Sequence, residues 1–365
     1  MTVSRPISYI ESVYTRREGQ VFPVRTIIPV FLFLIAVTLS ASTSWAIPEY
    51  YDRTVTDEIE QIERQVMLDS FAVADSICRE LIRSHPNDPA GYFFRAVGLL
   101  ADMVDGHEDL YPDLYLATLD SVDATVNRLI DTCGPDVLPW CYLFRGFAKS
   151  YRALYRGEFG FSSEAYKLGK AAVEDYKTCL ALEGAPYDAY LGLGSFHYWK
   201  SAKAGFWRVF GIVSDEREKG IREMQLAIDS STISKNAARK SFIAILIDHG
   251  DYDRAISLAS YMLDRFPGGR AFLWGLARAN YAKKDYSESL KYYERLRPQL
   301  AANPGNYYKL VECDAFIARC LSEMGRERDA RLRAIHLLAY QDDIPKTTRE
   351  LQKDHIKYLK EVIGP

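Results

Sequence analysis

The chain has 365 residues, of which 48% are hydrophobic and 26% are charged, so it can bury a sizeable core and lacks the composition of a disordered protein. Aromatic residues make up 13%, with 25 tyrosines, and tyrosine suits positions that are half packed and half solvated. The formal net charge of −3 offers no basic surface of the kind that nucleic-acid binding usually needs, so we expect no nucleic-acid partner.

The first residues have the order of a secretory signal. Arg17 and Arg25 precede an apolar run over residues 27–39, and a stretch of small residues ends at Ala46. The run is about 13 residues long, whereas a transmembrane helix needs about 20. We therefore predict that residues 1–46 are a signal peptide cleaved after Ala46, and that the protein is exported to the periplasm. The alternative is an uncleaved membrane anchor formed by the apolar run.

From residue 55 onwards, apolar residues recur at helical spacing, and no run of strict apolar and polar alternation predicts a strand. The first helices carry apolar or small residues on one face, namely Ala74, Cys78 and Leu81 before Pro86, and then Tyr92 and Ala96. The chain is therefore expected to be helical from its first ordered segment.

The segment 100–240 is less regular. Two helix pairs are indicated by residues at helical spacing: Tyr142, Gly146, Ala172, Tyr176 and Cys179 in one, and Tyr190, Gly194, Gly220, Met224 and Ala227 in the other. We expect a long turn over residues 155–163 in the first pair and an aromatic and basic insertion over residues 200–218 in the second. Residues 102–113 are expected to form an acidic insertion.

Aromatic and basic side chains gather over residues 187–210. Such residues are enriched at binding hot spots, because they combine a large contact area with a polar group. The predicted contact residues are Tyr190, His197, Tyr198, Lys200, Lys203, Trp207 and Arg208. Two alternatives stay open: the aromatic residues fill the core around a long connection, or they contact a membrane interface.

The clearest unit spans residues 241–267. Its first helix carries Phe242, Ile245 and Leu246, Gly250 ends that helix, and a second helix carries Ala255, Ala259 and Met262 before Pro267. This unit resembles the tetratricopeptide repeat, a pair of antiparallel helices of about 34 residues. The resemblance implies that Ala255 is the small residue at which the two helices touch.

The same pattern recurs downstream. Residues at corresponding places are Ala277, Tyr286, Ser289, Tyr293 and Leu296 in one unit, and Gly325, Ala330, Ala334 and Leu337 in the next. With the earlier helices, this predicts six or seven hairpins over residues 55–345, three of them clear. One helix pair cannot bury its own apolar face, so the pairs must stack. We therefore expect an all-α, right-handed superhelical solenoid.

Residues 346–365 are predicted to form a C-terminal capping helix. Ile356, Leu359 and Ile363 lie on one face, and the opposite side carries Arg349, Lys353, Lys357, Lys360 and Glu361. A terminal helix that is solvated on one side is what the end of a solenoid needs.

Six cysteines are present, and none forms a Cys-x-x-Cys motif. Cys313 and Cys320 are too far apart along one predicted helix to form a disulfide. Cys133 and Cys141 flank a turn at Gly134 and could pair if two helix ends meet there. We expect most of the cysteines to be free and buried, because cysteine packs as a small hydrophobic residue.

No motif for catalysis or for a cofactor is present, and we predict neither a cofactor nor a metal. The sequence lacks a phosphate-binding loop, a nucleophile elbow and a zinc-binding helix. Gly192 and Gly194 are interpreted as small residues that allow close helix packing. The acidic loop with Asp102, Asp105 and Asp109 is a weak candidate for a calcium site. The simpler interpretation is a solvated turn.

The family resemblance implies a concave groove that binds peptides or protein segments, although it fixes a fold and not an activity. We therefore predict a non-catalytic binding scaffold whose partner is a protein or peptide segment, with the oligomeric state left open. The alternatives are an assembly factor tethered to the membrane by residues 27–39 and an enzyme with a site in segment 100–240.

Overall fold

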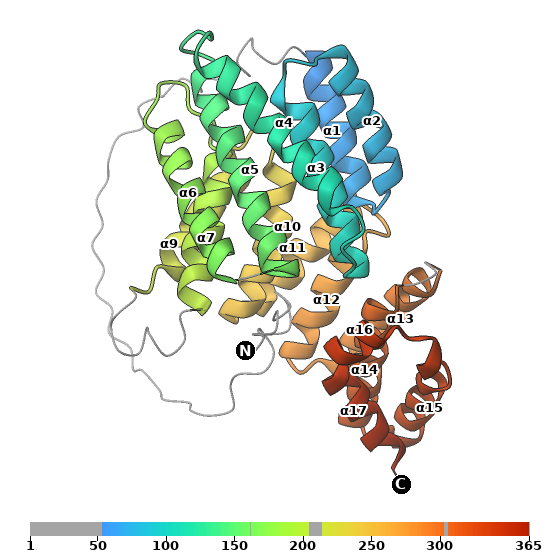
Figure 1. Ribbon diagram of the computed structural model, residues 1–365. Coiled ribbons are helices and arrows are strands. Elements are labelled where there is room, and N and C mark those ends of the chain that lie inside the picture. Colours follow the sequence, from blue (N-terminus) through green and yellow to red (C-terminus); the bar gives the residue numbers. More distant parts are fainter. Residues whose placement is uncertain (1–52, 161, 204–213, 303–305, 365) are drawn as a thin grey trace, which may run out of the picture.

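The computed structural model describes residues 53–160, 162–203, 214–302 and 306–364. Within these ranges the chain forms sixteen α-helices and one short 3-10 helix, with no strand (Figure 1). The all-helical prediction is confirmed, whereas the predicted signal segment lies outside the described residues. None of the helices in the described ranges is long and apolar enough to span a membrane.

Fourteen of these helices form seven consecutive pairs in mutual contact. The pairs are α1 (Arg53–Met67) with α2 (Phe71–Ser84), α3 (Pro89–Gly106) with α4 (Pro112–Ile130), α5 (Leu138–Phe159) with α6 (Ser162–Leu180), α7 (Ala189–Lys203) with α9 (Arg217–Ser230), α10 (Lys235–His249) with α11 (Tyr252–Arg265), α12 (Arg270–Ala282) with α13 (Tyr286–Ala301), and α14 (Tyr307–Glu323) with α15 (Glu327–Leu338). The 3-10 helix η2 (Gln341–Asp343), α16 (Lys346–Leu351) and α17 (Lys353–Ile363) follow as a cap. The expectation of six or seven stacked hairpins is therefore met.

The clear repeats have the geometry that their glycines and alanines predict. Gly250 ends α10 in the left-handed region, with φ +94°, and its N–H donates to the carbonyls of Leu246 and Ile247. Gly325 has φ +72° between α14 and α15. Ala255 and Ala330, five residues after each glycine, are fully buried. A residue with a side chain would have a strained backbone at position 250 or 325, because both positions lie in the left-handed region.

Glycines also allow a close helix contact, which joins α7 to α9. A Cβ atom added at Gly194 would lie 2.8 Å from the carbonyl oxygen of Gly220, and one added at Gly220 would lie 2.7 Å from that of Gly194. The two backbones therefore touch directly. The interpretation of Gly194 as a close-packing residue is confirmed, and Gly192 faces the ring of Tyr176 in the same way.

Gly194→Ala is expected to lower the free energy of unfolding by about 2 kcal/mol, because the new methyl group forces two backbones apart. The matched control is Gly98→Ala in α3, where an added Cβ meets nothing within 4 Å. There the change is expected to stabilise the chain by up to about 1 kcal/mol, because alanine has the better helix propensity. Urea unfolding of both variants checks the opposite signs, and a change in the same direction in both would contradict the close contact.

Three boundaries differ from the sequence expectations. The long turn over residues 155–163 is wrong, because α5 continues to Phe159 and α6 begins at Ser162. The acidic insertion is divided between two helices and their connection, since α3 runs to Gly106 and α4 begins at Pro112. The single capping helix is instead two helices that meet at Gln352.

The row of hairpins curves until its beginning meets its later part. The first helices of successive pairs contact one another from α1 through α3, α5, α7 and α10 to α12, and α14 contacts α3. Met67, at the end of α1, belongs to the apolar core that is otherwise built from Tyr198 onwards. In Figure 1 the last hairpins and the cap lie below the first hairpins. The inner sides of α1 and α3 are therefore covered in part by the chain's own later helices.

Candidate protein-binding surfaces

Two of the predicted contact residues on α7 are packing residues. Tyr198 is fully buried, and its hydroxyl donates to Asp248 Oδ2 at 2.7 Å. His197 is buried with its Nδ1 2.5 Å from Glu223 Oε2, and Lys219 Nζ lies 3.3 Å from its other ring nitrogen. These side chains hold α7 against α9 and α10, and a partner cannot reach the hydroxyl of Tyr198. Their assignment to a contact surface is corrected for this reason.

The remaining predicted residues have mixed positions. Tyr190 is half-buried, and its ring centroid lies 5.5 Å from that of Tyr187. Lys200 pairs with Glu216, and Lys203 is exposed at the end of α7. Trp207 and Arg208 lie outside the described residues. The role of these residues in binding therefore stays a prediction.

The structure adds an aromatic neighbour that sequence reasoning missed. Tyr166 on α6 is 53% exposed, and its ring stacks on Phe196 of α7 at 6.0 Å. Lys200 Nζ lies 5.8 Å from the centroid of the same Phe196 ring. We name Tyr166, Phe196, Lys200 and Lys203 the α6–α7 patch. Thirty residues separate Tyr166 from Phe196, and no periodicity within one helix relates them.

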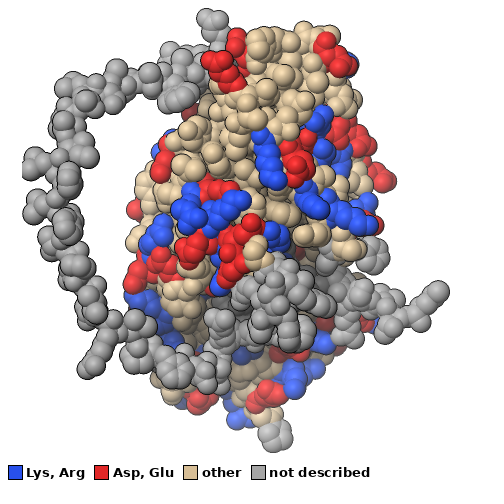
Figure 2. Space-filling view, turned by 90° about the vertical axis from the view of Figure 1, so that its left-hand side faces the viewer, with Lys and Arg blue, Asp and Glu red and all other residues tan. Residues whose placement is uncertain are grey.

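Figure 2 shows the side of the molecule on which α6, α7 and α9 lie. Lysine and arginine side chains alternate there with aspartate and glutamate across the middle of the face. A mixed surface of this kind produces no strong field of one sign. Specificity on this face would therefore come from the aromatic groups and from individual ion pairs.

Polar contacts join the first hairpins to the N-terminal ends of later helices. Asp69 Oδ2 accepts a hydrogen bond from the backbone N–H of Arg270 at 2.7 Å, at the first residue of α12. The Arg270 guanidinium donates to Asp105 at 2.8 Å, and Asn306 Nδ2 donates to the same carboxylate at 3.2 Å. Because the first N–H groups of a helix lack partners within the helix, a carboxylate at this place satisfies them and complements the helix dipole.

A second set of contacts continues along the same boundary. Glu63 of α1 accepts from Asn236 Nδ2 at 2.7 Å and from the backbone N–H of Ala237 at 3.2 Å, in the first turn of α10. The ring of His107 stacks on Tyr308 at 4.1 Å. We call the whole contact the seam, made by Glu63, Asp69, Asp105 and His107 on one side and by Asn236, Arg270, Asn306 and Tyr308 on the other. The seam joins the first two hairpins to α10, α12 and the start of α14.

Burial raises the pKa of Glu63 from its ordinary value of 4.5 to about 7, against the lowering effect of its hydrogen bonds to Asn236 and Ala237. The folded chain therefore holds a proton that the unfolded chain releases. The corresponding stability is fully present below pH 4.5 and is lost as the pH rises through about 7.

Glu63→Gln is expected to remove this pH dependence, because glutamine stays neutral. Relative to the variant, the natural chain should lose up to about 3 kcal/mol of unfolding free energy between pH 5 and pH 8. Urea unfolding of both proteins across this pH range is the measurement. Both chains share the other titrating groups, so parallel stability profiles would contradict the role assigned to Glu63.

The acidic loop serves contacts within the protein. Tyr111 donates to Asp102, and Tyr155 donates to Asp109 at 2.9 Å, while Asp105 belongs to the seam. Within the described ranges, no three His, Cys, Asp or Glu side chains gather as a metal site requires. Asp102, Asp105 and Asp109 therefore each have a partner within the protein.

The two cysteines that were expected to be able to pair lie together. The Cys133 thiol is within hydrogen-bonding reach of Cys141, and both are free. Burial, followed by the neighbouring Cys133, raises the pKa of Cys141 to about 12. A thiol with this pKa is almost entirely protonated at neutral pH and attacks slowly. A disulfide between the two stays a prediction.

Stacked helix pairs whose first helices contact one another in succession define a helical-repeat protein. Residues 245–307, from the second half of α10 to the start of α14, match the family model of the tetratricopeptide repeat. Residues 245–307 therefore contain tetratricopeptide repeats. None of the curated proteins compared with the chain matches it.

Proposed function

We propose that this chain is a non-catalytic scaffold that binds a segment of a partner protein outside the cytoplasm. The proposal rests on the tetratricopeptide match at residues 245–307, which lies within a continuous row of hairpins. Tetratricopeptide repeats generally bind proteins or peptides. Export after cleavage at Ala46 and a right-handed winding of the row are part of the proposal.

The α6–α7 patch is the contact surface that we assign to this function. Tyr166 offers an exposed ring supported from below by Phe196, so a partner can cover it without reorganising the core. Lys200 lies beside the rings and adds a polar contact. Exposed aromatic groups next to a cation are typical of residues that dominate binding energies.

Affinity capture with the tagged mature chain tests the scaffold. The natural chain should enrich specific proteins, and the double variant Tyr166→Ala, Lys200→Gln should lose them while its helicity is unchanged. The matched control is Tyr261→Ala with Lys291→Gln, because Tyr261 is 46% exposed on another second helix and Lys291 is also exposed. Equal capture by both double variants would exclude the patch, and no enrichment by the natural chain would contradict the scaffold.

The mass of the mature protein tests its location. A chain that begins at Ile47 supports export by a cleaved signal. An intact chain that retains residues 27–39 and sediments with membranes would instead support the tethered assembly factor.

A further inference from the structure

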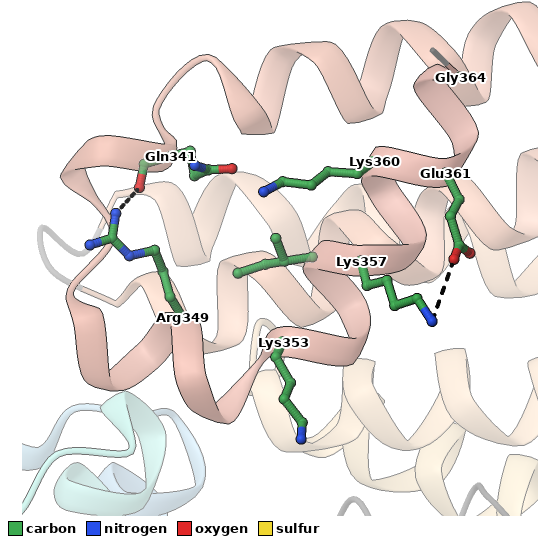
Figure 3. A pocket seen from close by; sticks show the side chains of 8 residues that line it. Gln341, Arg349, Lys353, Lys357, Lys360, Glu361 and Gly364 are labelled. Carbon is green, nitrogen blue, oxygen red and sulfur yellow. Dashed lines mark hydrogen bonds and ion pairs between the residues drawn. The ribbon is translucent and has the colours of Figure 1, made fainter.

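The C-terminal cap forms a hollow of about 770 Å³ whose lining is strongly basic. Its walls are one face of α17, the side chain of Arg349 on α16, and Gln341 of η2 (Figure 3). The charged lining residues are Arg349, Lys353, Lys357, Lys360 and Glu361, four cations against one carboxylate. The whole chain has a net charge of −3, so the lining of this hollow is opposite in sign to the chain as a whole.

The single carboxylate does little to neutralise the hollow. Glu361 pairs with Lys357 at 3.7 Å, and both are exposed at its rim. Lys353 and Lys360 form no ion pair with any other residue in the described part of the chain. In Figure 3 the ammonium group of Lys360 and the side chain of Gln341 point toward one another across the hollow. Charges of one sign that line a concave surface focus the field and attract counter-ions.

One apolar side chain lies at the base of the hollow. Ile356 lines it, and on the same helix Leu359 is fully buried against the last hairpin. Arg319 of α14 lies 4.0 Å above the ring of Tyr358, which fixes α17 further. Lysine stems cover apolar surface while their charged ends stay solvated. The hollow therefore offers apolar contact below and ammonium groups above.

We propose that this hollow binds an acidic segment of a partner protein, with carboxylates at the ammonium groups and an apolar side chain over Ile356. The inference rests on the proposed scaffold function and names the chemistry of one segment that it holds. Ammonium groups spaced around one apolar side chain fit a segment in which carboxylates alternate with apolar residues. The hollow lies on the cap, away from the α6–α7 patch. It is therefore a second contact surface of the scaffold.

A fluorescent peptide of glutamates interspersed with leucines is the probe, and binding is followed by anisotropy with the full mature chain. The natural chain should bind it saturably, and more weakly as salt rises. Lys353→Gln with Lys360→Gln should weaken binding about tenfold, because two exposed charge pairs are lost. Both lysines are exposed, so the thermal midpoint should not move.

The matched control is Lys177→Gln with Lys291→Gln, which removes two exposed lysines from second helices and changes net charge equally. It should bind the peptide as the natural chain does. Equal weakening in both double variants, no saturable binding, or preferential binding of phosphatidylglycerol vesicles or a single-stranded oligonucleotide would overturn the proposal. Failure here with intact affinity capture would leave the scaffold standing, whereas peptide binding without any captured protein would contradict the scaffold alone.

Discussion

Arg270→Ala is expected to lower the free energy of unfolding by about 3 kcal/mol, because it leaves two carboxylates in the seam without their cation. The side chains of Arg270, Asp69 and Asp105 are 15%, 12% and 15% exposed, so solvent screens the interaction little. Burial raises the pKa of Asp69, and Arg270 is the largest effect that opposes this rise. Urea unfolding of the variant measures the loss.

The control for the seam is Arg326→Ala. Arg326 pairs with Asp329 in an exposed helical turn, where both side chains are nearly half exposed. Its removal should change stability by less than about 0.5 kcal/mol. If the Arg270 variant were no less stable than this control, the seam would contribute nothing to the folded state.

Asp188→Ala is expected to cost about 4 kcal/mol, because it leaves several buried N–H groups without an acceptor. Asp188 is fully buried at the start of α7. Its carboxylate accepts from the backbone N–H groups of Thr232, Ile233 and Ser234 at 2.8–2.9 Å, and from the Ser234 hydroxyl at 2.7 Å. These bonds tie the connection between α9 and α10 to the preceding hairpin. Chemical unfolding with two probes, fluorescence and circular dichroism, measures the effect.

Asp229→Ala is the matched control for this position. Asp229 lies near the end of α9 and is exposed, and its carboxylate accepts a hydrogen bond from Gln225. The Asp229→Ala change should alter the free energy of unfolding by less than about 0.5 kcal/mol. A small effect at Asp188 as well would mean that the connection is held by other contacts.

The helical repeats could be predicted from the sequence because their signals are local. A glycine that ends a helix lies five residues before a buried alanine at both Gly250 and Gly325, and each hairpin needs only this spacing. Gly194 could likewise be interpreted from its size alone. The boundary at residues 155–163 was predicted wrongly because Gly157 and Gly160 favour a turn, whereas in the fold Gly157 lies inside α5 and its neighbour Glu158 is buried beside His107.

The seam could not be predicted, because the residues that form it are far apart in the chain. Asp69 and Arg270 are separated by 201 residues, and Glu63 and Asn236 by 173. In the sequence, Asp69 looks like an ordinary turn residue. Only the curvature of the whole row brings these groups together.

The burial of two predicted contact residues on α7, His197 and Tyr198, could not be predicted for a related reason. The helix packs on α5, α6, α9 and α10, so few of its positions face solvent. Helical spacing then cannot separate a buried ring such as that of Tyr198 from an exposed one. The aromatic partner of Phe196 comes from a different helix, which a single-helix pattern cannot show.

Hydrogen exchange at the amide of Arg270 tests the central structural claim most directly. This N–H is at the first position of α12 and has no partner within the helix, so exchange should be fast unless Asp69 accepts it. We predict slow exchange in the natural chain and fast exchange in the Asp69→Ala variant, with other helices unchanged. Fast exchange at Arg270 in the natural chain would show that the first and later hairpins do not meet.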